Sequence, residues 1–213
     1  MFANGSDTAY IAEYFFISHQ NIMARINKAA IIANANRSSK GCCCCARDPI
    51  FAHGLRVEVI KGWEGSKKPD TQDKLVAFDF AKDGTIIDGG VITSAIDFDD
   101  QAEWVAAIPE LEGSVYDFAL RFTGYIRFAE SGEKLLHVYV DDHLVMSLNG
   151  QEFWLGEGSK VGPHEATVTE VAEGLVHVNI TYAQFIAPKR LKLLEVVDET
   201  ATIIDSARFF HLA

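Results

Sequence analysis

The stretch that decides the fold runs from Phe118 to Gly150 and reads FALRFTGYIRFAESGEKLLHVYVDDHLVMSLNG. Large apolar residues occupy every second position in runs on both sides of the turn signal Ser131-Gly132. Successive side chains of a strand point to opposite faces, so this alternation predicts strands that are buried on one face. Two adjacent carboxylates, Asp141 and Asp142, separate the second run from a third. Such a pair at a strand end either caps a turn or presents oxygens to something outside the chain.

The same period of two continues on either side of this stretch. It predicts further strands over residues 54–60, 74–80, 175–186 and 189–197. Turn signals separate the strands, among them Lys82-Asp83-Gly84, Asp88-Gly89-Gly90 and Glu173-Gly174. Many short strands with polar residues on one face are typical of antiparallel sheets rather than of an α/β fold. The sequence therefore predicts an all-β domain over residues 50–213, an antiparallel β-sandwich or barrel-like fold.

Residues 1–49 differ in composition and predict a short N-terminal helical arm. Apolar residues recur at helical spacing between Ile22 and Ala33, so we expect an amphipathic helix over about residues 21–36. Residues 37–49 are polar, contain a glycine and close with Pro49, which is typical of a linker. A lone helix of this length is marginal in water, and the apolar YIAEYFFI at residues 10–17 would be hard for a solitary domain to bury. We therefore expect the arm to dock on the domain or on neighbouring subunits and to make the protein oligomeric.

The four cysteines of the chain are consecutive: Cys42, Cys43, Cys44 and Cys45. They cannot join distant strands of one chain, and adjacent cysteines do not form an unstrained disulfide. Their spacing also differs from that of zinc sites, where roughly two to four residues separate paired ligands. Three interpretations stay open: free thiols in a linker, acylation or bridging between chains, and metal capture.

The charge of the chain argues against nucleic acid as a partner. The sequence has 19 basic and 30 acidic residues and a formal net charge of −11, whereas phosphate binding requires clustered Lys and Arg. No stretch approaches the roughly 20 consecutive apolar residues of a transmembrane helix. The N-terminus lacks the basic segment of a secretory signal, and Glu13 interrupts its apolar run.

We expect no enzyme, because the sequence has no G-x-S-x-G elbow, Walker loop, Rossmann glycine pattern or H-E-x-x-H motif. Asp97, Asp99 and Asp100 have a spacing reminiscent of a calcium loop. They lack its later glycine and bidentate glutamate, so we expect them to face solvent at a strand end. The tryptophans at positions 63, 104 and 154 could stack on sugars but are expected to anchor the core. The scattered histidines are expected to be half-exposed strand residues.

Five segments of the chain resemble, in order, the landmarks of a known family. They are residues 54–65, 95–100, 117–151, 171–197 and 204–212. The family is the protective-antigen domain family, the β-sandwich module named for the anthrax toxin component and shared by flocculins, fungal adhesins and many glycoside hydrolases. The most specific part lies between Phe122 and Gly150. There Phe122-Thr123-Gly124-Tyr125 resembles the family's entry into a sheet, and Asp141-Asp142 resembles its paired aspartates.

The resemblance implies a non-catalytic module. In the lectin branch of the family, the paired aspartates, one joined by a cis peptide, hold a calcium ion that binds sugar hydroxyls directly. If this chain follows that branch, its calcium ligands are Asp141 and Asp142, and calcium is the one candidate cofactor. Many family members instead keep the aspartates as a structural element of the sandwich, and both interpretations stay open.

The resemblance departs from the lectin pattern after Tyr182. The lectins complete the calcium site there from a loop rich in Asn, Asp and Gly, whereas this chain has AQFIAPKR at residues 183–190. Gln184 is the only side-chain oxygen donor of this loop, and Lys189 and Arg190 would repel a cation. His143 directly follows the aspartates and would narrow the site. Together with the pair, His143 and Gln184 are the residues we expect to line a ligand site.

Two functions follow from these observations. The first is a structural or interaction subunit of a larger extracellular or particle assembly, with protein subunits as partners of the arm. The alternative is a carbohydrate-binding adhesion module, lectin-like and calcium-dependent if the aspartates hold the ion. Both place the protein outside the cell or on a particle surface, as the resemblance implies.

Overall fold

The computed structural model describes residues 49–63, 67–114, 116–154, 163–185 and 189–213. The chain divides into two units, Met1–Asp48 and Pro49–Ala213, and all described residues belong to the second. The predicted helix at residues 21–36 and the cysteines from Cys42 to Cys45 lie outside the described residues. The arm, its docking and its chemistry therefore stay predictions.

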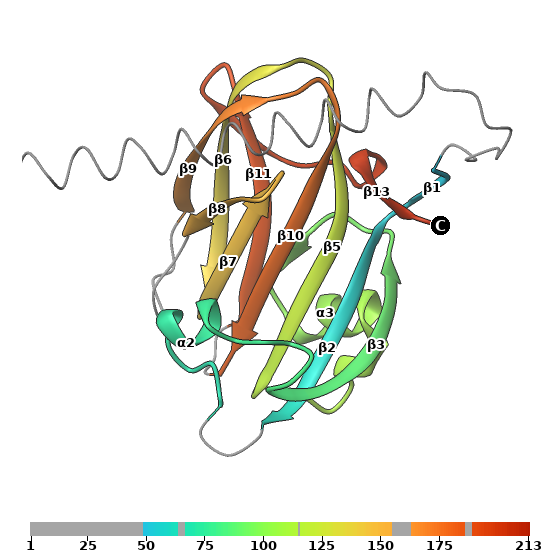
Figure 1. The fold of residues 1–213 in the computed structure, drawn as a ribbon, viewed down its shortest axis with the longest axis vertical. Helices are drawn as coiled ribbons and strands as arrows, with labels where there is room; N and C mark the ends of the chain where they lie inside the picture. Colours follow the sequence, from blue (N-terminus) through green and yellow to red (C-terminus); the bar gives the residue numbers. More distant parts are fainter. Residues whose placement is uncertain (1–48, 64–66, 115, 155–162, 186–188) are drawn as a thin grey trace, which may run out of the picture. The chain divides into compact units, whose positions relative to one another are not determined.

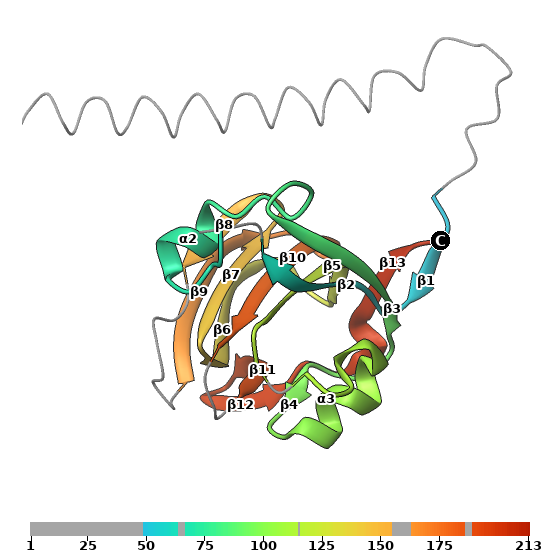
Figure 2. The same cartoon turned by 90° about the horizontal axis from the view of Figure 1, so that it is seen from below.

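The second unit is built from two antiparallel sheets that lie face to face (Figures 1 and 2). The larger sheet contains β1 (Phe51–His53), β13 (Phe209–Leu212), β5 (Phe118–Phe128), β10 (Gly174–Gln184), β7 (His143–Leu148) and β8 (Gln151–Trp154) in this order, with β2 (Leu55–Trp63) on β5 and β3 (Gly84–Ile92) on β2. The smaller sheet contains β12 (Thr200–Ile203), β11 (Arg190–Val197), β6 (Gly132–Asp141) and β9 (Pro163–Val171) in this order, with β4 (Asp97–Phe98) on β11. The prediction of an all-β antiparallel sandwich is confirmed.

The core lies between the two sheets and uses the alternating residues that the sequence singled out. Residues at every second position of β5, β6, β10 and β11 are almost completely buried, among them Leu120, Phe122, Val138, Val140, Val178, Ile180 and Leu193. Most of their neighbours along each strand point outward and are more exposed, but Ala119 and Ala183 are buried in a second, smaller cluster with Leu75 and Phe80. Burial of one face of each sheet fixes the register of the strands, because a slip by one residue would expose the whole apolar set.

Two strands share one edge of β5, and a glycine permits the change from one to the other. β13 pairs with β5 at Tyr125 and Ile126, and β2 takes over at Thr123. Gly124 lies between these two pairings. A Cβ atom there would lie 2.3 Å from the carbonyl oxygen of Phe210 and 2.7 Å from Leu55 Cδ2, so no larger residue fits without displacing a strand.

Two predictions about the segment before residue 93 were wrong. Residues 74–80 do not form a strand, because Gln72–Val76 is the helix α2, whose first turn is capped when Thr71 accepts a hydrogen bond from the backbone N–H of Lys74. The apolar alternation there is too short to distinguish a strand from a helix that begins at a strong cap. Asp88-Gly89-Gly90 is not a turn between strands but an irregularity within β3, where the register with β2 shifts.

The sequence also missed the helix α3 (Gln101–Ala107), which begins with a capping box between Asp100 and Glu103. The short 3₁₀ helices are η2 (Pro109–Leu111) and η3 (Ser206–Arg208). Trp104 of α3 is fully buried and stacks on Tyr182 with ring centroids 5.3 Å apart. This confirms the core role expected for that tryptophan.

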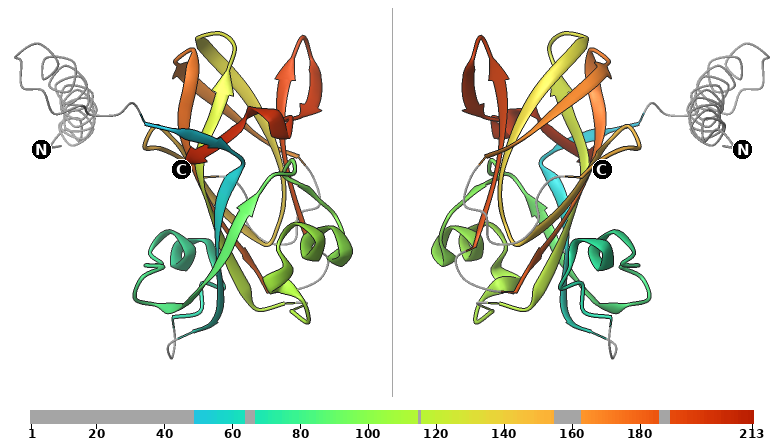
Figure 3. Two further views of the ribbon diagram at one scale, coloured as in Figure 1. Left: turned by 90° about the vertical axis from the view of Figure 1, so that its right-hand side faces the viewer. Right: turned by 90° about the vertical axis from the view of Figure 1, so that its left-hand side faces the viewer.

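The helices α2 and α3 flank the same end of the sandwich from opposite sides (Figure 3). The helix α2 lies outside the larger sheet beside β7 and β8, and α3 lies beside β4 (Figure 2). Among the described residues, no helix has the length and apolar character needed to span a membrane. The two helices therefore frame the end of the sandwich at which β6 and β7 meet.

Candidate functional site

The paired aspartates lie where the chain crosses from one sheet to the other. β6 of the smaller sheet ends at Asp141, which is opposite Arg190 of β11. β7 of the larger sheet begins at His143, which is opposite Ala183 of β10. Asp142 is therefore the only residue between the two strands, and its peptide bond with Asp141 is cis, as the resemblance implied.

The carboxylate of Asp141 is buried and has no hydrogen-bond partner. The side chain is 2% exposed, and neither Oδ1 nor Oδ2 makes a hydrogen bond in the part of the chain that the structure describes. Burial and, next, the adjacent carboxyl of Asp142 raise the pKa of Asp141 to about 6, although the charge of Arg190 opposes the shift. A buried anion without donors is unfavourable, so this position favours either a proton or a bound cation.

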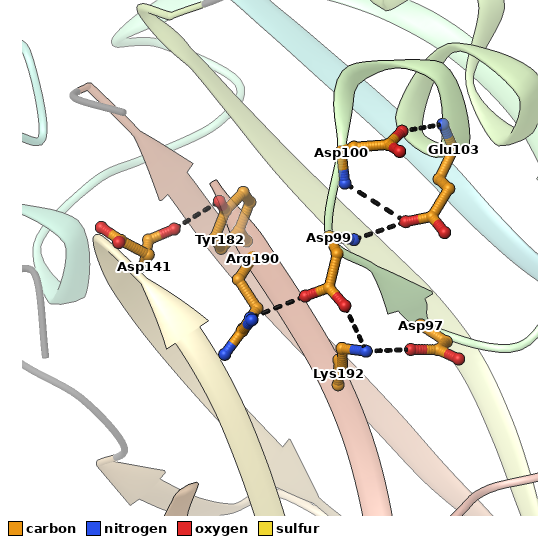
Figure 4. Close-up of polar contacts among 8 residues, drawn as sticks. All are labelled: Asp97, Asp99, Asp100, Glu103, Asp141, Tyr182, Arg190 and Lys192. Carbon is orange, nitrogen blue, oxygen red and sulfur yellow. Dashed lines mark hydrogen bonds and ion pairs between the residues drawn. The ribbon is translucent and has the colours of Figure 1, made fainter. Parts of the chain in front are cut away.

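The backbone around the pair is held by the end of β10. The hydroxyl of Tyr182 donates a hydrogen bond to the carbonyl oxygen of Asp141 (Figure 4). The same hydroxyl also contacts the side-chain oxygen of Gln184. Burial and the two carboxylates raise the pKa of Tyr182 well above its usual value, so this hydroxyl stays protonated. The backbone N–H of Phe185 donates to Oδ2 of Asp142 at 2.6 Å. These contacts position both aspartates and leave the carboxylate of Asp141 unoccupied by donors.

The two basic residues that were expected to repel a cation are engaged by acidic and amide groups near α3. The guanidinium of Arg190 pairs with Asp99 at 2.6 Å, and Asp99 also pairs with Lys192 at 2.5 Å (Figure 4). The ammonium of Lys189 donates to the side-chain oxygen of Gln101. The charge of Arg190 is thus largely balanced by Asp99, which weakens its repulsion of a cation at Asp141.

Two further polar side chains with unmet hydrogen-bonding atoms accompany the pair. Gln72 of α2 donates from Nε2 to the carbonyl oxygen of Leu144 at 2.8 Å, but its Oε1 is buried without a partner among the described residues. His143 is 9% exposed, and its ring lies 6.2 Å from that of Phe185. Its Nδ1 is likewise buried and makes no hydrogen bond within the described chain. The end of the sandwich therefore contains more polar atoms than its own hydrogen bonds satisfy.

The donor set at this end fits a hard cation. Calcium takes about six to eight oxygen ligands from carboxylates, carbonyls, waters and bound hydroxyls. The unpartnered Oδ1 and Oδ2 of Asp141, with the adjacent carboxylate of Asp142, are oxygen ligands of that kind. No group of three or more His, Cys, Asp or Glu side chains that could bind a metal occurs in the described ranges. Any further ligands would therefore come from carbonyls, water or a bound molecule.

The sequence identified part of this site and missed the rest. The structure brings together Asp141, Asp142, His143 and Gln184, the four residues expected to line a ligand site. Gln184 is fully buried and contacts the hydroxyl of Tyr182, so it supports the residue that positions Asp141. Asp97, Asp99 and Asp100 are exposed, as expected, and serve as ion-pair partners or as a helix cap. The residues that the sequence missed are Tyr182, Gln72 and Asp99, which no local motif marks as neighbours of the pair.

A comparison with protein-family models identifies the family of the chain from its sequence. The sequence model of the PA14 domain matches residues 75–197, more than half of the chain and the whole region of the aspartate pair. The chain belongs to the PA14 domain family. The family resemblance found in the sequence is thereby confirmed. No curated protein sequence matches the chain significantly.

Solved structures that resemble this PA14 domain share its fold at low sequence identity. The PA14 domain of the antifreeze protein MpAFP has a TM-score of 0.55 and 14% identity, covering 78% of this chain and 94% of that one. The epithelial adhesin 6 A domain of Candida glabrata, in complex with Galβ1-3GlcNAc, has a TM-score of 0.55 and 14% identity, covering 81% and 92%. The PA14 sugar-binding domain of an RTX adhesin has a TM-score of 0.50 and 20% identity, covering 75% and 99%. An anti-sigma factor domain-containing protein has a TM-score of 0.52 and 17% identity, and the match covers 76% of this chain and about half, 48%, of that one.

Proposed function

We propose that this PA14 domain is a non-catalytic carbohydrate-binding module of the adhesin type, with its ligand site at the crossing from β6 to β7. The observation that carries the proposal is the carboxylate of Asp141, whose two buried oxygens have no partner in the described chain. A site that holds an unpaired anion beside a second carboxylate is suited to a cation and, through it, to hydroxyl oxygens of a ligand.

Two of the similar structures support a carbohydrate as the ligand. One adhesin domain was solved with Galβ1-3GlcNAc, and the domain of the RTX adhesin is described as sugar-binding. Both match most of this chain and nearly all of their own length. They support the binding function over the structural-subunit function that the sequence favoured, and they support an extracellular location.

Each residue of the site has a role in the proposal. Asp141 and Asp142 hold calcium, and the bound ion supplies coordination positions for sugar hydroxyl oxygens. Tyr182 and the backbone N–H of Phe185 orient the two aspartates. The partly exposed ring of Phe185 lies beside that of His143 and offers an apolar face against which a sugar ring packs.

The test combines metal binding with ligand binding on the full-length chain. Calorimetry should detect calcium binding to the wild type in the micromolar-to-millimolar range, and Asp142→Asn should abolish it. Asp97→Asn is the matched control, because Asp97 is an exposed aspartate that pairs with Lys192 and does not contact the pair. A glycan array that includes Galβ1-3GlcNAc should then give calcium-dependent retention of the wild type and of the control.

The outcomes separate the two parts of the proposal. Calcium binding without retention of any glycan would leave a metal site and overturn the carbohydrate function. Glycan retention that is equally strong with calcium and in EDTA, and equally strong in the wild type and in Asp142→Asn, would overturn the role of the pair. A folded protein that shows no heat of calcium binding in calorimetry and no retention of any glycan on the array would overturn both parts of the proposal.

A further inference from the structure

A row of polar side chains crosses the outer face of the larger sheet, away from the aspartate pair. Thr123 of β5 lies opposite Asn179 of β10, which in turn lies opposite Ser147 of β7. Ser147 lies opposite Glu152 of β8. The pairings place these four side chains side by side on one face, because directly opposed residues of antiparallel strands share a face of the sheet.

A groove lies over this row, next to the segment that follows α2. It encloses about 180 Å³ and is lined on the sheet by Ser147, Glu152 and Asn179, and on the other side by Phe78 and Phe80. The two phenylalanine rings meet edge to face with centroids 5.2 Å apart. The groove thus combines hydroxyl, amide and carboxylate groups with an aromatic wall, a combination suited to a ligand with both polar edges and an apolar face.

One atom in the groove lacks a partner. Oδ1 of Asn179 is buried and accepts no hydrogen bond from the described residues, although Ser147 and Thr123 are its direct neighbours in the sheet. A buried acceptor left unsatisfied costs free energy, and a donor from outside the chain would remove that cost. The groove therefore favours a ligand that donates a hydrogen bond at this point.

Among the described residues that line the groove, the one arginine is Arg121, and its charge is already balanced by an ion pair, so the groove does not select an anion. Arg121 forms an ion pair with Glu58 of β2, and its guanidinium lies 4.7 Å from the centre of the Phe80 ring. Glu152 is exposed and offers a second acceptor for hydroxyl groups. The volume is below the roughly 300–1,000 Å³ of pockets for drug-sized ligands, which limits the occupant to about one small ring.

We propose that this groove binds a single neutral sugar ring, at a site separate from the aspartate pair. Asn179 accepts a hydroxyl hydrogen, Ser147 and Glu152 bind further hydroxyls, and the partly exposed Phe78, held by the buried Phe80, packs against the apolar face of the ring. The helix α2 separates the two sites, because Gln72 is bonded to Leu144 near the pair whereas Leu75 lines the groove. Binding here needs no metal and does not depend on the function proposed for Asp141 and Asp142.

The test uses saturation-transfer NMR on the full-length chain in EDTA, with the methyl glycosides of glucose, galactose, mannose and N-acetylglucosamine as probes. At least one probe should receive saturation in the wild type and in Asp142→Asn. Asn179→Ala should weaken that binding at least tenfold. Ser147→Ala should have the same effect, and it decides the test if Asn179→Ala folds poorly. Thr123→Ala is the matched control, because Thr123 belongs to the same polar row but does not line the groove.

The results decide between this site and the aspartate pair. Backbone amide shifts at residues 145–152 and 179–181 that follow probe concentration in EDTA would support the groove. Absence of saturation for all four probes in EDTA would overturn it, as would a signal that Asn179→Ala and Ser147→Ala leave unchanged. A signal that appears only with calcium and disappears in Asp142→Asn would assign all sugar binding to the aspartate pair and overturn the second site.

Discussion

Replacing Asp141 with asparagine is expected to stabilise the calcium-free protein at neutral pH. The pKa of this carboxyl is raised from 3.8 to about 6 in the folded protein by burial and by the neighbouring Asp142. The unfolded chain therefore loses this proton at a lower pH than the folded chain does. Between about pH 4 and pH 6 the folded state holds the extra proton, so its stability falls as the pH rises.

The size of the effect follows from the shift. A difference of about two pKa units corresponds to about 3 kcal/mol of unfolding free energy, lost in full once both states are ionised near pH 7. Below about pH 4 the carboxyl is protonated in both states and the penalty is absent. Asp141→Asn has no proton to lose, so it should be more stable than the wild type at pH 7 by up to about 3 kcal/mol, with a smaller difference near pH 4.

The assay is urea unfolding in EDTA between pH 4 and pH 7.5, followed by the fluorescence of Trp104 and the other tryptophans. The difference between variant and wild type isolates Asp141, because the ion-paired carboxyls whose pKa is lowered, such as Asp99, titrate in both proteins. Calcium at pH 7 should raise the stability of the wild type and leave Asp141→Asn unchanged. A difference between the two proteins that does not vary with pH would refute the reasoning, since it would mean that Asp141 titrates normally in the folded state.

Three further predictions concern the residues around the site. Tyr182→Phe should lower the unfolding free energy by about 1–3 kcal/mol and weaken calcium binding in calorimetry, because it leaves the carbonyl of Asp141 without its donor; an unchanged affinity would show that the hydroxyl does not position the pair. Asp99→Asn should change the unfolding free energy by less than about 1 kcal/mol, since its ion pairs are partly exposed. It should nevertheless weaken calcium binding several-fold, because the charge of Arg190 is no longer balanced. Asp97→Asn leaves Arg190 paired with Asp99 and should bind calcium like the wild type. Gly124→Ala should lower the unfolding free energy by at least about 2 kcal/mol in urea titration, because the new methyl group meets the carbonyl oxygen of Phe210, whereas a neutral result would mean that β13 shifts without cost.

The segment between α2 and β3 shows where sequence reasoning failed. Val76, Phe78 and Phe80 alternate like strand residues, yet Phe80 is buried under the outer face of the larger sheet and Val76 is 54% exposed. Alternation over so few residues is compatible with a helix that leads into a turn, and the cap at Thr71 decides the outcome. Periodicity over so short a segment therefore decided neither which of these residues are buried nor which surface covers them.

The sequence by itself determined the sandwich. Long alternating runs in β5, β6, β10 and β11 predicted strands buried on one face, and the order of the family-like segments predicted the family. Both signals depend only on residues that are close together in the sequence. What only the tertiary structure decided is the chemistry of the two candidate sites. The surroundings of Asp141 depend on Tyr182 and Arg190, about 40 to 50 positions away along the chain. The groove depends on Asn179, Ser147 and Glu152 being aligned by long-range register. Burial and hydrogen bonding at these atoms are properties of strands brought together in space, and no stretch of neighbouring residues encodes them alone.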